Sequence, residues 1–484
     1  MVFSDLFFLY VFIPCFALCY LLGALIDRLI TKANENDPTV AIKPAMNFKN
    51  TMLILFSLIF YAWGEPVYIL LMLGSVFINY IAGLLVNAYG KVGLTIGIVC
   101  NILILGVFKY AGFIATTLAD CGVPILIPTI SLPIGISFYT FQSISYLVDV
   151  YRKEAPVQRE FKGLLLYISM FPQLIAGPIV RYNTVAQEIN NRRITANDFA
   201  DGLFRFLLGL GKKVILANQF SEIVEQFLGN GLPELTTSGA WLGILAFTMQ
   251  IYFDFSGYSD MAIGLGKCMG FHFNENFDHP YCCNSITDFW RRWHISLGSF
   301  FRDYVYIPLG GNRQHQFLNI LIVWFLTGMW HGASWNFIIW GVYFGIIVAL
   351  EKYTILKLTH FVFIPFRHLY ALALVIIGWG IFYFDNFSEM TSFFMTAFAQ
   401  QHTLHNFVTE SAITDKMWLW IAAFVFCLPV RKWAVMGVAK VISNETAQQL
   451  IYTICRIVVS LFMLAVSTAL LVGATNNAFI YTRF

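Results

Sequence analysis

Charged side chains are scarce in this chain of 484 residues. Asp, Glu, Lys and Arg together make up 12% of it, whereas about 25% is usual in soluble domains. The apolar fraction is 58% and the mean hydropathy is +0.69. So few charges cannot cover a soluble surface, and a globular core cannot hold so many apolar side chains. The composition therefore excludes a soluble globular protein and predicts an all-α, polytopic integral membrane protein.

Motifs of several familiar functions are also missing. The nine cysteines form no CxxC pair, so neither a zinc site nor a disulfide framework is indicated. No GxxxxGK motif occurs, which argues against ATP-driven transport, and neither HExxH nor GxSxG is present. The net charge of +3 gives no polybasic reason to expect nucleic acid. His402 and His405 lie three apart in a polar loop, where a metal use is the lesser alternative, and we expect no metal site.

Apolar segments crowd the chain, and several are shorter than the roughly 20 residues of a full crossing. The first begins without a basic residue before it, so we read it as a retained span rather than a signal peptide. The four basic residues between positions 28 and 49 place the following loop in the cytoplasm and the N-terminus outside. The expected spans and part-spans are 6–26, 51–63, 66–87, 93–113, 132–149, 163–180, 239–256, 316–330, 333–350, 364–384, 416–430 and 447–473.

No internal repeat and no linker long enough to separate a soluble domain is found in the sequence. We therefore expect one transmembrane domain over residues 1–484, with the motif region at about 160–350. Short apolar segments are tolerated only where their backbone lines a protein cavity. The prediction is about 11 transmembrane helices with re-entrant and interfacial helices around a central cavity.

His331 is the leading candidate for chemistry, because an ionisable residue inside an apolar run is usually functional or paired. From Phe317 to Leu350 the sequence has no Asp, Glu, Lys or Arg. As one helix this run would be about 51 Å long, against about 30 Å of hydrocarbon, so it must break, and 332–334 is the expected place. A neutral histidine at a break can act as a general base. The alternative is a core histidine that is hydrogen-bonded across helices.

His294 is the second candidate. It lies within residues 286–306, where aromatic and apolar residues recur at helical spacing among charged ones. That pattern predicts an amphipathic helix at a membrane interface or packed against the bundle, too charged to span. The alternative for His294 is an interfacial histidine beside phosphate-binding arginines, Arg291 and Arg292.

Asp254 and Asp260 form the third group, beside an apolar segment with several hydroxyl groups. A carboxylate there can orient a histidine, cap a helix or pair with an arginine. Structural pairing is the alternative that we favour for both residues.

Four long stretches, taken in order, resemble the membrane-bound O-acyltransferase family, specifically its bacterial alginate O-acetylation branch. They are QIYFDFSGYSDMAIGLG at 250–266, ENFDHPY at 275–281, DFWRRWHISLGSFFRDYVYIPLGGNR at 288–313 and TGMWHGASWNFIIWG at 327–341. Further matching segments, such as FPQLIAGPIVRY at 171–182, extend the resemblance over nearly the whole chain.

The resemblance implies that His331 matches the invariant histidine of the family and His294 its second conserved histidine. It implies an acyl thioester donor in the cytoplasm, an acceptor outside, and no bound cofactor. Apart from the resemblance, an activated thioester needs little more than a positioned base and a stabilised oxyanion. We expect His331 to take the proton of the acceptor hydroxyl, and His294 to position the donor or stabilise the oxyanion, aided by Arg291 or Arg292 on donor phosphates. Asp254, Asp260 and Ser334 are expected as supporting positions around the histidines.

The resemblance also implies partners: an extracytoplasmic SGNH-type acetyltransferase or small membrane protein, a possible acyl carrier, and the bilayer of a bacterial inner membrane. Two alternatives keep the fold, namely D-alanyl transfer to teichoic acid and peptidoglycan O-acetylation. A polymer exporter with histidines lining a conduit is a third, and the missing P-loop and repeat symmetry count against it.

Overall fold

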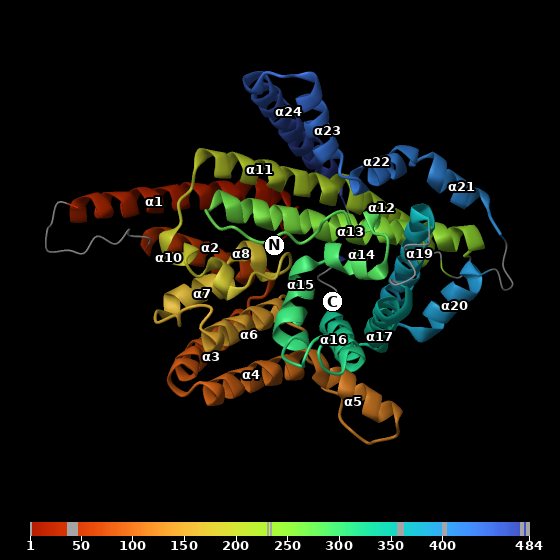
Figure 1. The fold of residues 1–484 in the computed structure, drawn as a ribbon, viewed down its shortest axis with the longest axis horizontal. Coiled ribbons are helices and arrows are strands. Elements are labelled where there is room, and N and C mark those ends of the chain that lie inside the picture. Colours follow the sequence, from red (N-terminus) through yellow and green to blue (C-terminus); the bar gives the residue numbers. More distant parts are fainter. Residues whose placement is uncertain are drawn as a thin grey trace. The chain divides into compact units, whose positions relative to one another are not determined.

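The structure is a computed structural model, and it describes residues 2–35, 47–229, 232, 235–355, 363–398, 404–474 and 479–480. Every regular element in these ranges is a helix (Figure 1). The all-α prediction is thereby confirmed. Contacts within the chain divide it into two compact units. Unit 1 comprises 1–206, 259–274 and 481–483, and unit 2 comprises 207–258, 275–480 and 484. The expectation of one domain over 1–484 stays a prediction.

Six helices in the described ranges are long and apolar enough to cross a membrane. They are Phe8–Lys32, Ile69–Tyr89, Lys91–Asp120, Trp335–Thr354, Ile364–Tyr383 and Glu445–Val472. A bent pair, Met417–Cys427 and Val430–Val441, turns by 71° and is either a seventh broken span or a re-entrant loop. The expected number of about 11 therefore stays a prediction. Of the other expected segments, 239–256 lies within the 32-residue helix α13 (Thr237–Cys268). The segments 51–63, 132–149, 163–180 and 316–330 fall in helices of at most 18 residues.

Unit 1 is built from the N-terminal helices. They are η1 (Phe8–Phe12), α1 (Ile13–Glu35), α2 (Asn47–Gly64), α3 (Ile69–Tyr89), α4 (Lys91–Leu105), η2 (Gly106–Tyr110), α5 (Ala111–Asp120), α6 (Ile136–Arg152), α7 (Phe161–Ser169), α8 (Phe171–Leu174), α9 (Tyr182–Val185), α10 (Glu188–Asn191) and most of α11 (Ala196–Gly211). The buried carboxylate of Asp27 on α1 accepts the backbone N–H groups of Phe48 and Lys49, each at 3.0 Å. A carboxylate at this place satisfies donors that the first turn of α2 leaves open.

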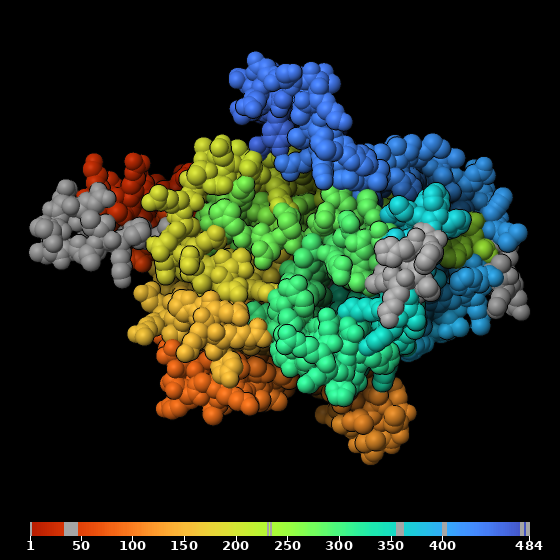
Figure 2. Space-filling view, in the orientation of Figure 1, coloured from red at the N-terminus to blue at the C-terminus, as the bar shows by residue number. Residues whose placement is uncertain are grey.

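Unit 2 contains the longer part of α13 (Thr237–Cys268), the described helices between α11 and α13, and the described helices after α13. They are η3 (Lys212–Ala217), α12 (Asn218–Val224), η4 (Glu225–Gly229), η6 (Pro280–Cys282), α14 (Ile286–Arg292), α15 (Ile295–Phe301), η7 (Arg302–Tyr306), α16 (Gln316–His331), α17 (Trp335–Leu350), η8 (Glu351–Ile355), α19 (Ile364–Tyr383), α20 (Phe387–Ala397), α21 (Phe407–Thr414), α22 (Met417–Cys427), α23 (Val430–Val441) and α24 (Glu445–Val472). Helices α23 and α24 form a narrow projection with open sides (Figure 2), and few side chains of α24 are buried. Such an apolar helix suits contact with lipid.

The predicted break in the run 317–350 is confirmed. Helix α16 ends at His331, residues 332–334 are not helical, and α17 begins at Trp335. The two helices pack closely, because Gly328 and Gly341 face one another and a Cβ on Gly328 would collide with the carbonyl oxygen of Phe337. Glycine at such contacts lets helix backbones approach in a membrane.

The single amphipathic helix predicted over 286–306 is wrong. Helix α14 ends at Arg292, Trp293 is extended, and α15 starts only after His294. The chain breaks because residues 276–278 bind the turn: Ile295 N–H donates to Asn276 and Asp278 N–H to the Arg292 carbonyl, at 3.0 and 2.9 Å.

The aromatic residues that recur at helical spacing in this segment lie inside unit 2, because Phe289, Trp293 and Phe300 are at most 3% exposed. Trp293 packs against Trp379 of α19, with ring centroids 4.9 Å apart. The segment is therefore packed against the bundle, which is one of the two placements expected for it.

Candidate active site

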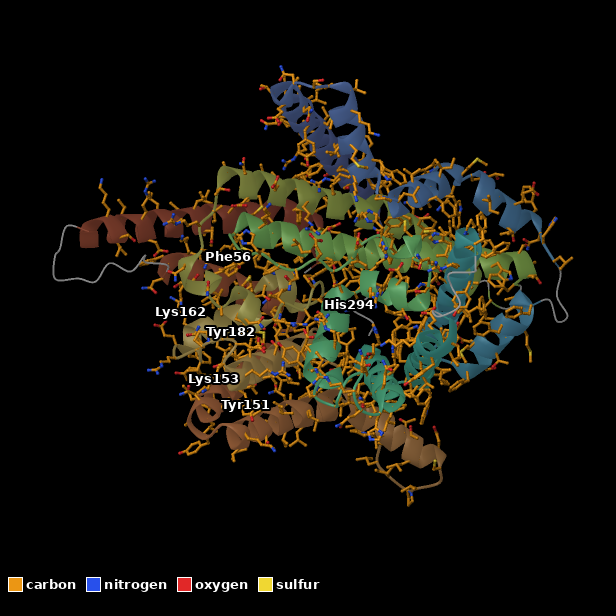
Figure 3. All side chains as sticks on the ribbon, viewed as in Figure 1. Phe56, Tyr151, Lys153, Lys162, Tyr182 and His294 are labelled. Carbon is orange, nitrogen blue, oxygen red and sulfur yellow. The ribbon has the colours of Figure 1, made fainter. Side chains whose placement is uncertain are left out.

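His294 lies at the turn between α14 and α15 (Figure 3). Its backbone has φ 45° and ψ 53°, in the left-handed region that residues with a side chain seldom adopt. The residue is 1% exposed. Unfavourable backbone conformations cost free energy and gather at functional sites, where the surrounding structure holds them. The turn is therefore a candidate site on backbone geometry as well as on residue type.

Asn276 holds the His294 ring. Its Oδ1 atom lies 3.0 Å from Nδ1 of His294. The same oxygen accepts two hydrogen bonds from Ser296, one from the hydroxyl at 2.8 Å and one from the backbone N–H at 3.3 Å. Asn276 is itself 1% exposed. The His294 ring is thus held by the buried amide of Asn276, and the two hydrogen bonds from Ser296 hold that amide in place.

His331 is the last residue of α16 and is 6% exposed. Its ring centroid lies 5.0 Å from that of Trp330, 5.0 Å from that of Trp340 and 5.2 Å from that of Phe382. Gly332, with extended backbone, ends the helix directly after it. The predicted position of His331 at a helix break is therefore found, and its surroundings are aromatic.

The two histidines lie close together in unit 2. Trp330 contacts both rings, with its centroid 5.7 Å from that of His294 and 5.0 Å from that of His331. Burial lowers the pKa of His294 well below its ordinary value of 6.5, and the charge of His331 lowers it further. His294 is therefore neutral at neutral pH, and a neutral imidazole can accept a proton.

A cavity of about 470 Å³ reaches this site. His294 lines it, whereas His331 is not among the described residues of its wall. Three cationic side chains line the same cavity: Arg291 from α14, Arg302 from η7 and Lys352 from η8. A cation-lined cavity that ends at a buried neutral histidine suits a substrate that carries both negative charge and a reactive group.

Comparison with known proteins shows the family and the reaction class of the chain. Residues 151–394, about half of the chain, match the membrane-bound O-acyltransferase family. The probable alginate O-acetylase AlgI of Azotobacter vinelandii is 42% identical over 400 residues, which are 80% of this chain and 76% of that protein. The chain belongs to the membrane-bound O-acyltransferase family. It is an O-acyltransferase and a multi-pass membrane protein.

Two further relatives of this O-acyltransferase carry other names. The peptidoglycan O-acetyltransferase of Helicobacter pylori is 36% identical over 379 residues, 70% of this chain and 69% of that protein. The teichoic acid D-alanyltransferase of Bacillus subtilis is 29% identical over 241 residues, 46% of this chain and 59% of that protein. All these names describe transfer of an acyl group, so the relatives agree on the reaction class and differ in the acceptor or acyl group.

The two arginines predicted to bind donor phosphates have different surroundings in the acyltransferase. Arg291 lines the cavity and is exposed. Arg292 forms a salt bridge with Asp288, with Nε 3.0 Å from Oδ1, and that carboxylate raises the pKa of Arg292. Of the pair, Arg291 is therefore better placed to meet a ligand, while the role predicted for both stays a prediction.

Asp254 is buried in an ion pair. Its Oδ1 lies 2.6 Å from Nζ of Lys213, and its Oδ2 accepts the backbone N–H of Ile480 at 2.8 Å. Phe479 packs over Nζ of Lys213 at 4.6 Å and edge-on to Tyr258 at 4.8 Å. This carboxylate therefore fastens the C-terminal segment to α13, which is the structural pairing that we favoured.

Asp260 belongs to unit 1 and pairs with Arg205, whose Nη2 and Nε lie 2.9 and 3.0 Å from Oδ1. Ser334 is the half-buried N-cap of α17 and has extended backbone. Supporting roles for these two residues and for Asp254 around the histidines stay predictions.

Sequence reasoning missed three residues of the site. Asn276 lies in the ENFDHPY stretch. That stretch supported the family resemblance, but no role was predicted for any of its residues. Lys352 follows Glu351, the residue directly after the charge-free run, and Arg302 is one of the charged residues within 286–306. Neither cation is the charge nearest in sequence to His294 or His331, so spacing along the chain did not single them out.

His402 lies outside the described residues, and His405 is exposed. Within the described ranges no group of three His, Cys, Asp or Glu side chains is placed to hold a metal ion.

Proposed function

We propose that this protein moves an acetyl group from a cytoplasmic thioester donor across the membrane for O-acetylation of an extracytoplasmic, alginate-like polysaccharide. The observation that carries the proposal is the cation-lined cavity that reaches neutral His294 beside His331. The relatives named for alginate O-acetylation cover 80% of the chain at 40–42% identity, which favours this acceptor over the others.

The donor is an acyl thioester that bears phosphate, either acetyl-CoA or a carrier-bound phosphopantetheine. Arg291 and Lys352 supply positive charge in the cavity wall. Arg302 lines it too, but Asp303 binds Arg302 Nε and Nη2 at 2.6 and 3.0 Å and offsets much of that charge. Arg291 and Lys352 are therefore the main contacts for phosphate in this proposal.

The transfer needs a base and little else, because a thioester is already activated. A hydroxyl oxygen of the acceptor attacks the carbonyl carbon of the thioester, and His331 takes the hydroxyl proton. The C–S bond then breaks, the ester C–O bond is complete, and His331 returns the proton to the leaving thiolate sulfur. Aromatic burial of His331 keeps water from the thioester while the two substrates are held together.

The acyl group then reaches the polymer through a partner. We propose an extracytoplasmic SGNH-type acetyltransferase, or a small membrane protein, as the acceptor side of this relay, and a cytoplasmic acyl carrier as a possible donor side. In this proposal the protein lies in a bacterial inner membrane. Its N-terminus faces outward, and the loop after the first span lies in the cytoplasm, because basic residues follow that span.

Peptidoglycan O-acetylation is the second candidate, since a relative of that name matches 70% of this chain. D-alanyl transfer to teichoic acid has weaker support, because the named relative matches only 46% of it. Polymer export is the least supported alternative, since the relatives above are named for acyl transfer.

Mass spectrometry of the cell-surface polymers, from cells with and without the protein, tests the proposal. We expect O-acetyl esters on an extracellular polysaccharide to depend on the protein. Loss of acetyl esters from peptidoglycan alone, or of D-alanyl esters, would support the corresponding alternative instead. Unchanged acylation of every polymer would overturn O-acyl transfer to a polymer as the function.

A further inference from the structure

The hydrogen bonds around Asn276 determine which nitrogen of His294 carries a proton. A backbone N–H is always a donor, and that of Ser296 points at Oδ1 of Asn276. The Ser296 hydroxyl donates to the same atom at 2.8 Å. The atom that faces both donors must be the amide oxygen and not the amide nitrogen, because nitrogen in an amide accepts no hydrogen bond.

The tautomer of His294 follows from that orientation. Nδ1 of His294 lies 3.0 Å from the same amide oxygen, which has only lone pairs to offer. Nδ1 therefore carries the proton and donates it to Asn276, and Nε2 is the basic nitrogen of the ring. A neutral imidazole has one donor and one acceptor, so a partner on one nitrogen decides the role of the other.

We propose that Asn276 is a positioning residue that holds His294 in the Nδ1–H tautomer, so that its Nε2 is a hydrogen-bond and proton acceptor during acyl transfer. This rests on the proposed function and sharpens it. A neutral histidine with Nε2 unprotonated cannot donate to a developing oxyanion. His294 therefore works on the base side of the reaction with His331 and does not stabilise the oxyanion, a role that its position in the cavity wall would otherwise allow.

The surroundings of Asn276 explain why the tautomer is held firmly. The ring of Phe255 lies edge-on to that of His294, with centroids 4.7 Å apart, so the imidazole cannot turn without displacing it. The backbone carbonyl of Asn276 also accepts the N–H of Ile295, the residue after His294. Rotation of the imidazole by half a turn about its bond to Cβ would place Cδ2–H against the amide oxygen and lose the hydrogen bond from Nδ1.

Nitrogen-15 NMR of the full-length protein labelled at histidine tests the tautomer directly, because protonated and unprotonated ring nitrogens resonate far apart. The signals of His294 are those missing from His294→Asn. In the wild type we expect a protonated Nδ1 and an unprotonated Nε2. In Asn276→Ala we expect that preference to be lost, whereas Ser296→Ala should keep it, since the backbone N–H of residue 296 still orients the amide.

Acylation by the same variants tests the consequence. Asn276→Ala should lower kcat about 100-fold, the scale of losing a positioned base, with the donor KM within about twofold, because no donor contact is lost. Asn276→Asp offers an oxygen at the same place and should recover most of that loss. A structural role alone would predict lower protein yield and the same tautomer in the protein that folds.

Two results would overturn the proposal: an Nε2–H tautomer in the wild type, or full kcat in Asn276→Ala with the tautomer changed. The wild-type spectrum decides the first even if Asn276→Ala does not fold. Absence of acyl transfer by the wild type would instead count against the proposed function. The NMR spectrum does not depend on turnover. Failure of the proposed function can therefore be distinguished from failure of the tautomer proposal.

Discussion

His294 and His331 share one aromatic neighbour, Trp330, and the charge of His331 lowers the pKa of His294. At neutral pH the two rings therefore carry at most one positive charge between them. One proton is what the transfer reaction moves, from the attacking hydroxyl to the leaving thiolate. The chemistry at the residue scale thus rests on a pair and not on a single histidine.

The lowered pKa of His294 predicts a pH dependence of stability. Above about pH 6.5, the ordinary value, this histidine is neutral in both the folded and the unfolded chain. As the pH falls below that value, His294 becomes protonated in the unfolded chain but stays neutral in the folded protein. The free energy of unfolding should fall by up to about 1.4 kcal/mol per pH unit until the folded pKa is reached.

Unfolding of the detergent-solubilised protein between about pH 5 and 8 measures this effect. His294→Asn is the matched variant, because asparagine tolerates the left-handed backbone and does not titrate. The wild type should lose more stability on acidification than this variant. Parallel curves for the two proteins would contradict the burial-lowered pKa.

Both histidines could be predicted from the sequence, but Asn276 could not be assigned. His331 stands out because it interrupts a long run without charges, and this signal is local. The role of Asn276 depends on a contact across 18 positions that forms only when the loop before α14 folds back on the turn after it. Nothing in the spacing of residues 276 and 294 indicates that contact.

At the scale of elements, α16 and α17 form a hairpin that fixes His331. The glycines at the crossing bring the two backbones together, and the aromatic side chains beyond it surround the histidine ring. The buried carboxylate of Glu351, at the end of α17, accepts the N–H groups of Ile286 and Thr287 at 2.7 Å each. The hairpin therefore also places the start of α14, the helix that carries Arg291.

Gly328→Ala should destabilise the protein by about 1–3 kcal/mol, the usual cost of overpacking. The added methyl group meets the carbonyl oxygen of Phe337, and backbone cannot yield as a flexible side chain can. Gly437→Ala is the control, since nothing lies within 4 Å of its added carbon, and alanine in a helix should be neutral or stabilising by up to about 1 kcal/mol. Thermal unfolding of both variants in detergent measures the difference, and equal behaviour would refute the close packing of α16 on α17.

The two helix breaks differ in how far the sequence reveals them. The break after His331 follows from length alone, since the apolar run is too long for one crossing. The break at His294 leaves no such trace, because Phe289, Trp293 and Phe300 keep helical spacing across it. These side chains are buried in two short helices just as they would be in one long helix. Periodicity therefore could not locate the turn.

At the scale of the whole molecule, the scarcity of charge predicted a helical membrane protein, and this is confirmed by the helices and the family. The number of spans was harder to predict. An apolar segment such as 163–180 reads as a crossing, but α7 and α8 divide it into short helices that are buried in unit 1. Apolar sequence that is buried in protein and apolar sequence that faces lipid look alike, so hydropathy alone does not fix the number of crossings.

Acyl transfer by a buried histidine pair is the central claim, and the acetyl content of the extracellular polysaccharide tests it most directly. His331→Ala and His405→Ala are compared in cells at equal amounts of protein in the membrane, and His405 is an exposed histidine remote in sequence from the site motifs. We predict acetylation at the wild-type level in His405→Ala and at least about 100-fold less in His331→Ala. Acetylation near the wild-type level in His331→Ala would contradict the claim.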